Sequence, residues 1–438
     1  MNTKWLKNEL SNTFPLHSQS RFSVQVRYLL IGILLLVFTL NYLQRVNVSI
    51  LMADPEFITA LGLTGETGKQ GWLMTLFLLA YAVTNILTGS LGDRFGPRRI
   101  MSLGILLGGL ATALGGMATG LGTLLVVRVL LGIGQGLYYP NQGVFIRRWF
   151  PPWERGKANS LCSLGGNLGT ITAMPLFALI TVSWGWQMNF YLIAVVALVF
   201  ILPAVWFLIS DWPQESSLLG AAERSYLAKN NPNDGTVLIR QKGFMMEAVK
   251  EVFKVPQIIW FILVYISFLS IWYGLLTWLP QYLTVARGFP FKTMGFLSAL
   301  PYIAGIGGLI LSGFGSDRLG RRAPFALVAF ISTSLLLYAA AITTNVKACV
   351  LLISLATGTL SLFIGVFWAM VQTRLPLHLV GLGTGVISGV GNLFSAFAPL
   401  FIGFLIQLTG QYLIGILYMV AFGVVGAACS WTLARTET

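Results

Sequence analysis

Twelve apolar runs divide this 438-residue chain, and each is close to the length of helix that crosses a lipid bilayer. Roughly 20 apolar residues span about 30 Å of hydrocarbon, and a spanning helix satisfies its own backbone polar groups. A charged fraction of 10%, against about 25% in soluble domains, agrees with that setting. We therefore predict an all-α membrane protein. The runs cover residues 28–52, 70–91, 99–118, 121–146, 156–180, 185–210, 256–286, 292–316, 324–342, 347–374, 380–407 and 410–434.

Lysine and arginine are concentrated in the N-terminal tail and in alternate loops, notably 94–99, 147–157 and 318–322. Cytoplasmic loops of helical membrane proteins carry such an excess. We therefore predict that both termini are cytoplasmic and that the chain is a multi-pass protein of the cytoplasmic membrane. The polar segment 1–27 contains no cleavable signal. The net charge of +14 comes from basic residues that are spread over successive short loops, as this topology predicts. We therefore expect no nucleic-acid partner.

A polar stretch at 211–255 separates the first six runs from the last six. It predicts a cytoplasmic linker between an N-terminal bundle at 28–210 and a C-terminal bundle at 256–434, with tails at 1–27 and 435–438. Within the linker, residues 244–253 alternate apolar and charged residues at helical spacing and could lie along the membrane surface. We prefer the simpler interpretation of a tether without further function.

The two halves also repeat a short motif. Gly89-Ser-Leu-Gly-Asp-Arg-Phe-Gly follows the second run, and Gly313-Phe-Gly-Ser-Asp-Arg-Leu-Gly follows the eighth. Glycine allows close approach of helices, and a carboxylate here can meet a helix N-terminus or a cation across the interface between the halves. Such duplication is typical of transporters. We predict that conformational gating depends on Gly89, Asp93, Arg94, Asp317 and Arg318.

On these motifs the chain resembles the major facilitator superfamily over essentially its full length. Three segments, 41–47 (Asn-Tyr-Leu-Gln-Arg-Val-Asn), 149–159 (Trp-Phe-Pro-Pro-Trp-Glu-Arg-Gly-Lys-Ala-Asn) and 184–186 (Trp-Gly-Trp), are similar to the anion:cation symporter family of organic-anion carriers. A fourth, 211–214 (Asp-Trp-Pro-Gln), is similar to organophosphate:phosphate antiporters. The resemblance implies twelve helices in two pseudo-repeated six-helix bundles that rock around a midplane site.

Two arginines interrupt apolar runs that contain no acidic residue. Arg45 lies about seven residues inside the outer end of the first run, and Arg128 about seven residues after the outer start of the fourth, so both are near 10 Å deep at about 1.5 Å per residue. Snorkelling to the headgroups is the alternative. The shared depth favours a functional role, and the resemblance places both at substrate-binding or gating positions. A guanidinium group suits carboxylate or phosphate, so we predict that both bind the anionic group of a substrate.

Polar and aromatic residues on neighbouring runs complete the predicted substrate site. Gln44 precedes Arg45, and Gln135 returns to the face of Arg128 after two helical turns. Each remaining candidate could instead serve helix packing, where amide hydrogen bonds are common. These candidates are Tyr81, Trp272, Trp368, Gln372, Ser388 and Asn392.

The coupling ion is constrained by a departure from the family pattern. The resemblance implies acidic residues at positions 44 and 135 in proton-coupled members, but both are glutamine here, and glutamine does not titrate. His17 and His378 lie outside the runs. We therefore expect exchange or uniport of a small organic anion, such as a sugar acid, carboxylate or organic phosphate. The alternatives are a proton-coupled symporter and a sugar-phosphate/phosphate antiporter, although the latter family has an arginine where Trp272 stands.

Other classes of protein are less well supported. A channel does not require the duplicated six-plus-six pattern, and an enzyme needs a nucleophile or metal cluster, which the runs lack. A transporter-like receptor that binds without moving its ligand stays open. Cys162, Cys349 and Cys429 all lie in apolar runs, so we predict no disulfide, metal site or cofactor. We expect a monomer in the bilayer with a small anionic substrate as its partner.

Overall fold

The structure is a computed structural model that describes residues 25–88, 91–231, 250–319, 322–376 and 379–435; for 313–319 and 380–381 it describes the backbone alone. Twelve helices in these ranges are long and apolar enough to cross a membrane, which confirms the predicted all-α fold. Their ends lie within a few residues of the predicted runs. The first six spans are α2 (Val26–Leu51), α4 (Thr67–Thr88), α6 (Pro97–Gly116), α7 (Leu121–Trp149), α8 (Arg155–Trp184) and α9 with α10 (Trp186–Val195 and Leu202–Leu208). The last six are α13 (Ile258–Gln281), α14 (Phe291–Leu319), α15 (Ala323–Ile342), α16 (Val346–Arg374), α17 with α18 (Val380–Ser395 and Ala398–Thr409) and α19 (Tyr412–Arg435).

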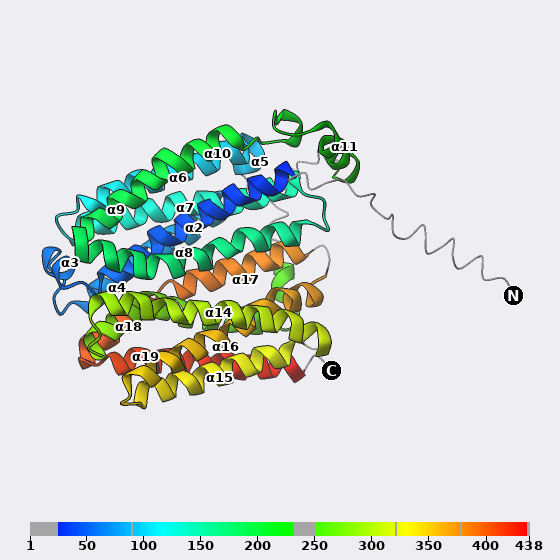
Figure 1. The fold of residues 1–438 in the computed structure, drawn as a ribbon. Coiled ribbons are helices and arrows are strands. Elements are labelled where there is room, and N and C mark those ends of the chain that lie inside the picture. Colours follow the sequence, from blue (N-terminus) through cyan, green and yellow to red (C-terminus); the bar gives the residue numbers. More distant parts are fainter. Residues whose placement is uncertain (1–24, 89–90, 232–249, 320–321, 377–378, 436–438) are drawn as a thin grey trace.

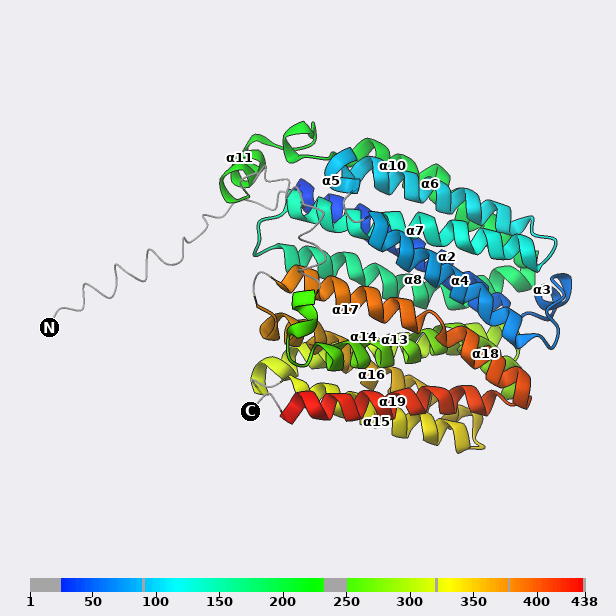
Figure 2. The same cartoon turned by 180° about the vertical axis from the view of Figure 1, so that it is seen from behind.

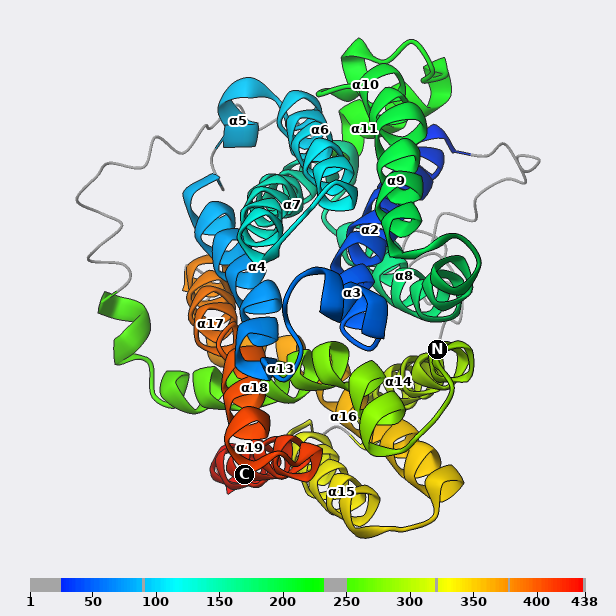
Figure 3. The same cartoon turned by 90° about the vertical axis from the view of Figure 1, so that its left-hand side faces the viewer.

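The helices of each half pack mainly against one another. In the first half α2 packs on α8 and α7 on both α4 and α6, while in the second α16 packs on α14 and α15 and α19 on α13 and α15. Figure 3 shows the two groups on opposite sides of the molecule, and Figures 1 and 2 show the spans running in parallel layers. Contacts between the halves join α8 to α14, α4 to α18 and α2 to α13. The substrate site predicted between the halves is therefore bounded by α2, α4 and α13.

Three departures from straight spans have local causes. The eleventh span breaks between Ser395 and Ala398, because Pro399 in the first turn of α18 cannot continue the helix before it. Gly185 has φ of 81°, in the left-handed region, and separates α8 from α9. The sixth and seventh spans contain π-helical turns at Val196–Ile201 and Tyr282–Ala286.

The halves are sealed at one end by direct contacts between α4 and α18. Thr67 Oγ1 donates to the carbonyl oxygen of Gly403 (2.8 Å), and the Gly68 N–H donates to Gln407 Oε1 (2.9 Å). A Cβ on Gly71 would lie 2.7 Å from the carbonyl oxygen of Pro399, so only glycine allows the backbones to approach this closely. This seam lies at the end of the molecule opposite to the start of α2 and the end of α19, which share one end (Figure 1).

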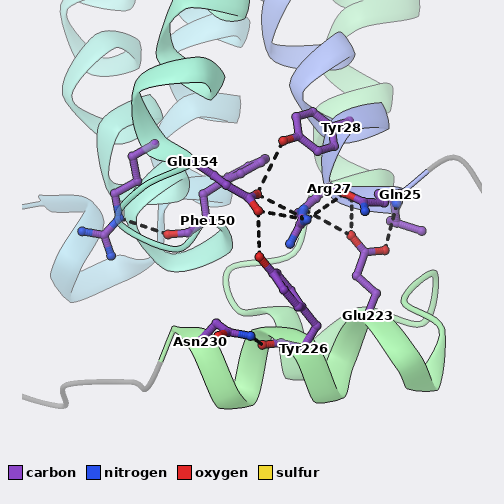
Figure 4. A network of polar contacts seen from close by, with 10 residues as sticks. Gln25, Arg27, Tyr28, Phe150, Glu154, Glu223, Tyr226 and Asn230 are labelled. Carbon is purple, nitrogen blue, oxygen red and sulfur yellow. Dashed lines mark hydrogen bonds and ion pairs between the residues drawn. The ribbon is translucent and has the colours of Figure 1, made fainter. Parts of the chain in front are cut away.

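The linker contains a short helix, α11 (Ala221–Asn230), that docks on the first half (Figure 4). Glu223 accepts from the N–H of Val26 (2.9 Å) at the start of α2, and Arg27 forms ion pairs with Glu154 (3.2 Å) and Glu223 (3.7 Å). Tyr226 donates to Glu154 (2.8 Å); burial, together with this bond, raises the pKa of its hydroxyl, so it remains a neutral donor. This part of the linker is therefore fixed to the first half. The predicted surface segment 244–253 lies outside the described residues except for its last four.

The repeated motif of the first half forms an electrostatic cluster at the same end. Asp93, on α5 (Leu91–Phe95), pairs with Arg147, and its carboxylate also lies 4.0 Å from Arg148. The predicted cation is present, but it belongs to α7 of the same half and not to the opposite bundle. The helix N-terminus is occupied by a different carboxylate, since Asp211 accepts from the N–H of Arg98 (2.8 Å) in the first turn of α6.

Candidate functional site

Arg45 projects from α2 into a box of aromatic rings. Its Cζ lies 4.8 Å from the ring centroid of Tyr42, 5.0 Å from that of Phe77 and 5.2 Å from that of Tyr81. Aromatic faces stabilise a cation without neutralising its charge. Nη2 donates to Gln135 Oε1 (3.1 Å), whereas the buried Nε has no hydrogen-bond partner. The side chain is 6% exposed and thus does not extend along the lipid-facing surface.

The two predicted glutamines hold one another and Arg45 in place. Gln135 Nε2 donates to the carbonyl oxygen of Asn41 (2.9 Å) and to Gln44 Oε1 (3.3 Å). Gln44 Nε2 in turn donates to Thr112 Oγ1 (3.0 Å) on α6. Both amides are buried. This network turns the Gln135 carbonyl oxygen toward Arg45, so the oxygen that faces the guanidinium carries a dipole and no formal charge.

Arg128 differs from Arg45 in how its donors are used. Its Nε donates to the carbonyl oxygen of Leu73 (2.7 Å), Nη1 to that of Gln44 (3.5 Å), and Nη2 contacts Met74 Sδ (3.4 Å). The side chain is 1% exposed and its Cζ lies 4.6 Å from the ring of Phe77. Arg128 therefore ties α7 to α2 and α4. The two arginines share the Phe77 ring, whose centroid lies 5.0 Å from Cζ of Arg45 and 4.6 Å from Cζ of Arg128.

No carboxylate neutralises this pair among the described residues, because neither arginine takes part in an ion pair there. Arginines elsewhere in the described chain do find carboxylates, as Arg27 and Arg147 show. No cluster of His, Cys, Asp or Glu able to hold a metal ion occurs in the described ranges. The site thus has an excess of positive charge inside the membrane.

The second half contributes aromatic rings and a closed set of polar groups. The hydroxyl of Tyr273 on α13 donates to Asn392 Oδ1 (2.9 Å) on α17. Asn392 Nδ2 donates to the carbonyl oxygen of Ser388 (2.9 Å). The half-buried ring of Trp272 packs edge-on against Tyr302, with centroids 5.5 Å apart, and that of Trp368 packs edge-on against Tyr265 at 5.2 Å.

Of the predicted site residues, Arg45, Gln44, Gln135 and Tyr81 form one cluster, which Arg128 joins through Gln44. A second cluster contains Asn392 and Ser388. Gln372 is exposed near the end of α16 and belongs to neither cluster of the described residues.

The predicted gating residues fall into three groups. Arg94 is exposed beside the ring of Phe95, whereas Asp93 belongs to the cluster with Arg147 on α7. Gly89 lies outside the described residues, as do the side chains of Asp317 and Arg318.

Sequence reasoning missed two residues that contact Arg45. Phe77 lies one helical turn before Tyr81, and Tyr42 one turn before Arg45, so the i,i+3 and i,i+4 spacing of helix neighbours contained the signal. Tyr302, against which Trp272 packs, was also missed.

Twelve spans in two groups of six, with two buried arginines in the first group, are typical of membrane transporters. A family model, "Major Facilitator Superfamily", matches residues 34–399. This chain belongs to the major facilitator superfamily, and it is a transporter and not an enzyme.

Curated relatives extend this assignment. The chain is 30% identical over 401 residues to the "Probable sulfoacetate transporter" of Cupriavidus necator, with 89% of each chain covered. It is 27% identical to the "Hexuronate transporter" of Bacillus subtilis, with 86% of this chain and 88% of that one covered. These relatives confirm the resemblance to the anion:cation symporter family.

Among solved structures, a bacterial homologue of the human lysosomal transporter Spinster, in an inward-facing and unoccupied conformation, matches with a TM-score of 0.77. The match covers 94% of this chain and 98% of that one at 18% identity. A D-xylose–proton symporter matches with a TM-score of 0.71 at 16% identity. At these identities the likeness shows the fold alone.

Proposed function

We propose that this protein carries a small organic anion across the cytoplasmic membrane by alternating access, through exchange of one anion for another. The class of substrate is a sugar acid, a carboxylate or an organic phosphate. Names of relatives, which include sulfoacetate and hexuronate transporters, support an anionic cargo. Both termini would be cytoplasmic, with the seam between α4 and α18 on the outer side.

One observation carries the proposal: Arg45 is a buried cation with an unused donor and no carboxylate partner in the described structure. Burying a charge without a counter-ion costs roughly several kcal/mol of desolvation free energy. Aromatic rings and one amide oxygen offset part of that cost. An incoming anion would supply the missing charge, with its oxygens on Nε and the remaining Nη of Arg45.

The two arginines would have different roles in substrate binding. Arg45 would contact the anion directly, assisted by Gln44, Gln135 and Tyr81. Arg128, whose donors bind backbone carbonyls and a thioether, would act through its charge and by fixing α7 to α2 and α4. Of the two guanidinium groups predicted to contact the substrate, only that of Arg45 would do so under this proposal.

Neutral glutamines next to Arg45 support exchange in preference to proton symport. A titrating carboxylate in the bundle is the usual proton carrier, and Gln44 and Gln135 occupy the positions from which it would act. Moving one negative charge inward against about 100 mV costs roughly 2.3 kcal/mol. Exchange for a second anion removes that cost without a coupling ion.

Alternating access would follow from rocking of the bundles 28–210 and 256–434 about the site. The seam at Gly71 and Gly403 is closed, so the described conformation would be the one open toward the cytoplasm. The cluster around Asp93, with the repeat at Asp317, would stabilise the opposite conformation or its transitions. Figure 2 shows α4, α17 and α18 side by side at this interface, as their contacts also indicate.

Counterflow into proteoliposomes tests the function. Vesicles that contain the purified protein are loaded with one unlabelled anion and given the labelled form outside, for glucuronate, gluconate, phenylacetate and glycerol phosphate in turn. We expect saturable counterflow of at least one anion, and a loss of about 100-fold or more in Arg45→Ala. Arg287→Ala is the control, because Arg287 binds the carbonyl oxygens of Ala340 and Thr343 away from the site. Intact counterflow in Arg45→Ala would overturn the proposal.

A further inference from the structure

The hydrogen-bond network around Arg45 extends through the two glutamines to a hydroxyl group on α6. Arg45 Nη2 donates to Gln135 Oε1 (3.1 Å), and Gln135 Nε2 donates to Gln44 Oε1 (3.3 Å). Gln44 Nε2 donates to Thr112 Oγ1 (3.0 Å), which donates in turn to the carbonyl oxygen of Gly108 (2.7 Å), one helical turn earlier. All four side chains are buried.

Close packing of α6 against α7 brings Thr112 to the glutamines. A Cβ on Gly134 would lie 2.9 Å from the backbone nitrogen of Gly108, so glycine allows the two helices to touch. Gly134 directly precedes Gln135 in α7, and Thr112 follows Gly108 by one turn in α6. A Cβ on Gly108 would lie 3.7 Å from both polar atoms of the Gln44 amide, which therefore lies at this contact.

The direction of each bond in the network is fixed by groups that have a single hydrogen-bonding role. A guanidinium can only donate, and a backbone carbonyl can only accept. Gln135 binds one of each kind, since it accepts from Arg45 and donates to the carbonyl oxygen of Asn41 (2.9 Å). Its N–H groups therefore face Gln44, which must accept with Oε1 and donate with Nε2. Thr112 then has to accept from Gln44, and its single proton is left for the carbonyl oxygen one turn earlier.

The Gln44 amide depends on Thr112 for its orientation. In the described part of the chain it binds two side chains, those of Thr112 and Gln135. Without the Thr112 hydroxyl, the N–H groups of Gln44 would be buried and unpaired, which is unfavourable. Rotation of Gln44 to satisfy them would take its oxygen away from Gln135, which would keep one of the two bonds that its Nε2 donates.

We infer that Thr112 is a positioning residue of the anion site, which acts through Gln44 and Gln135 and does not contact the substrate. Its hydroxyl fixes the direction of the network so that an oxygen, and not an N–H group, faces Arg45. An amide turned the other way would present donors to a guanidinium that can only donate, and Arg45 would lose the bond that holds it in place. This inference rests on the proposed function, because it concerns the same anion-binding group.

Counterflow kinetics of Thr112 variants test the inference. The substrate is whichever of glucuronate, gluconate, phenylacetate and glycerol phosphate the wild-type protein exchanges fastest, and its KM and maximal rate are measured in proteoliposomes. Thr112→Val removes the hydroxyl and keeps the shape of the side chain. We expect it to raise KM about fivefold or more and to change the maximal rate by less than about twofold. Thr112→Ser keeps the hydroxyl, so its KM should stay within about twofold of the wild-type value.

Thr170→Val is the matched control. Thr170 is fully buried in α8 and donates to the carbonyl oxygen of Gly166 (2.9 Å), one turn earlier, but it accepts from no side chain in the described structure. This variant loses a comparable hydroxyl, and its KM should stay within about twofold of the wild-type value. An equal rise of KM in Thr170→Val and Thr112→Val would show a general packing effect and refute the inference. Thr112→Ala removes the same hydroxyl from a smaller side chain and replaces the valine variant if that one does not reconstitute.

A double variant tests whether Thr112 acts through Gln44. In Gln44→Leu the network is already interrupted, so adding Thr112→Val should raise KM further by less than about twofold. If the effects of the two substitutions multiply in full, Thr112 acts by another route and the inference is wrong.

The outcomes distinguish this inference from the function beneath it. If counterflow requires Arg45 but Thr112→Val keeps the wild-type KM, or Thr112→Ser raises KM as much as Thr112→Val does, the proposed function stands and the inference is wrong. If none of the four anions is exchanged, or if Arg45→Ala exchanges them like the wild type, both are wrong.

Discussion

Gln135→Glu would place a carboxylate where an amide oxygen now lies 3.1 Å from Nη2 of Arg45. Two unit charges about 4 Å apart attract by roughly 4 kcal/mol at an effective dielectric constant near 20. In the wild type, a substrate already displaces the hydrogen bond from Arg45 to the neutral Gln135 Oε1, and a bond to a charged group is worth about 2 kcal/mol. The difference, about 2 kcal/mol, is what an anionic substrate would have to overcome to displace the new carboxylate from Arg45.

That free energy corresponds to about a 30-fold weaker affinity, since about 1.4 kcal/mol is tenfold. The assay is anion binding and counterflow at pH 7.5 and at pH 5.5, with Gln135→Leu as the uncharged control. We expect Gln135→Glu to bind weakly at both pH values, because the attraction to Arg45 that competes with the substrate also keeps the carboxylate ionised. Gln135→Leu should lose a few-fold at both. Unchanged affinity in Gln135→Glu at both pH values would refute the assignment of Arg45 as the anion-binding group.

Three further predictions concern coupling, linker and seam. At zero membrane potential, an inward proton gradient should change wild-type uptake by less than about twofold, because Gln44 and Gln135 cannot titrate; a large stimulation, measured in proteoliposomes, would show another proton carrier. Glu154→Gln should cost about 1–2 kcal/mol by removing one ionic partner of the buried Arg27, seen as a lower melting temperature and faster proteolysis of the linker; unchanged proteolysis would mean that other contacts hold α11. Gly71→Ala should open the seam with α18 and raise maleimide labelling of Gln70→Cys from outside; an unchanged rate would mean that the backbones shift without opening.

The spans were predictable because their signal is local and strong. A bilayer demands about 20 apolar residues in each helix, so α15 at Ala323–Ile342 agrees with the predicted 324–342. Where the signal is weak, the ends were misplaced: α8 continues to Trp184, four residues past the predicted end at 180, until Gly185 turns the chain. The break before Pro399 was readable from proline alone, although hydropathy does not report it.

The site was predictable in part, because an arginine in an apolar run is conspicuous whatever its neighbours are. Its neighbours were not, since contacts across helices depend on rotation and tilt that the sequence does not fix. Arg45 and Arg128 look equivalent in sequence, yet the Nε of Arg45 has no partner, whereas that of Arg128 donates to the carbonyl oxygen of Leu73. The docking of α11 on Arg27 was missed for the same reason: neither Glu223 nor Glu154 is near Arg27 in the chain.

The excess charge of the site also bears on why exchange would be favoured over uniport. To return empty, the carrier must enclose Arg45 and Arg128, two cations that contact the same Phe77 ring, with no carboxylate paired to either in the described structure. To return loaded, it encloses the same pair with one charge neutralised. Enclosing an unpaired charge costs roughly several kcal/mol of desolvation free energy. Each addition of about 1.4 kcal/mol to the activation barrier slows a step tenfold. We therefore expect counterflow to exceed net efflux from the same proteoliposomes by at least about 100-fold. Equal rates, measured with the membrane potential clamped at zero, would mean that the empty carrier reorients freely and that the charge on Arg45 and Arg128 does not restrain it.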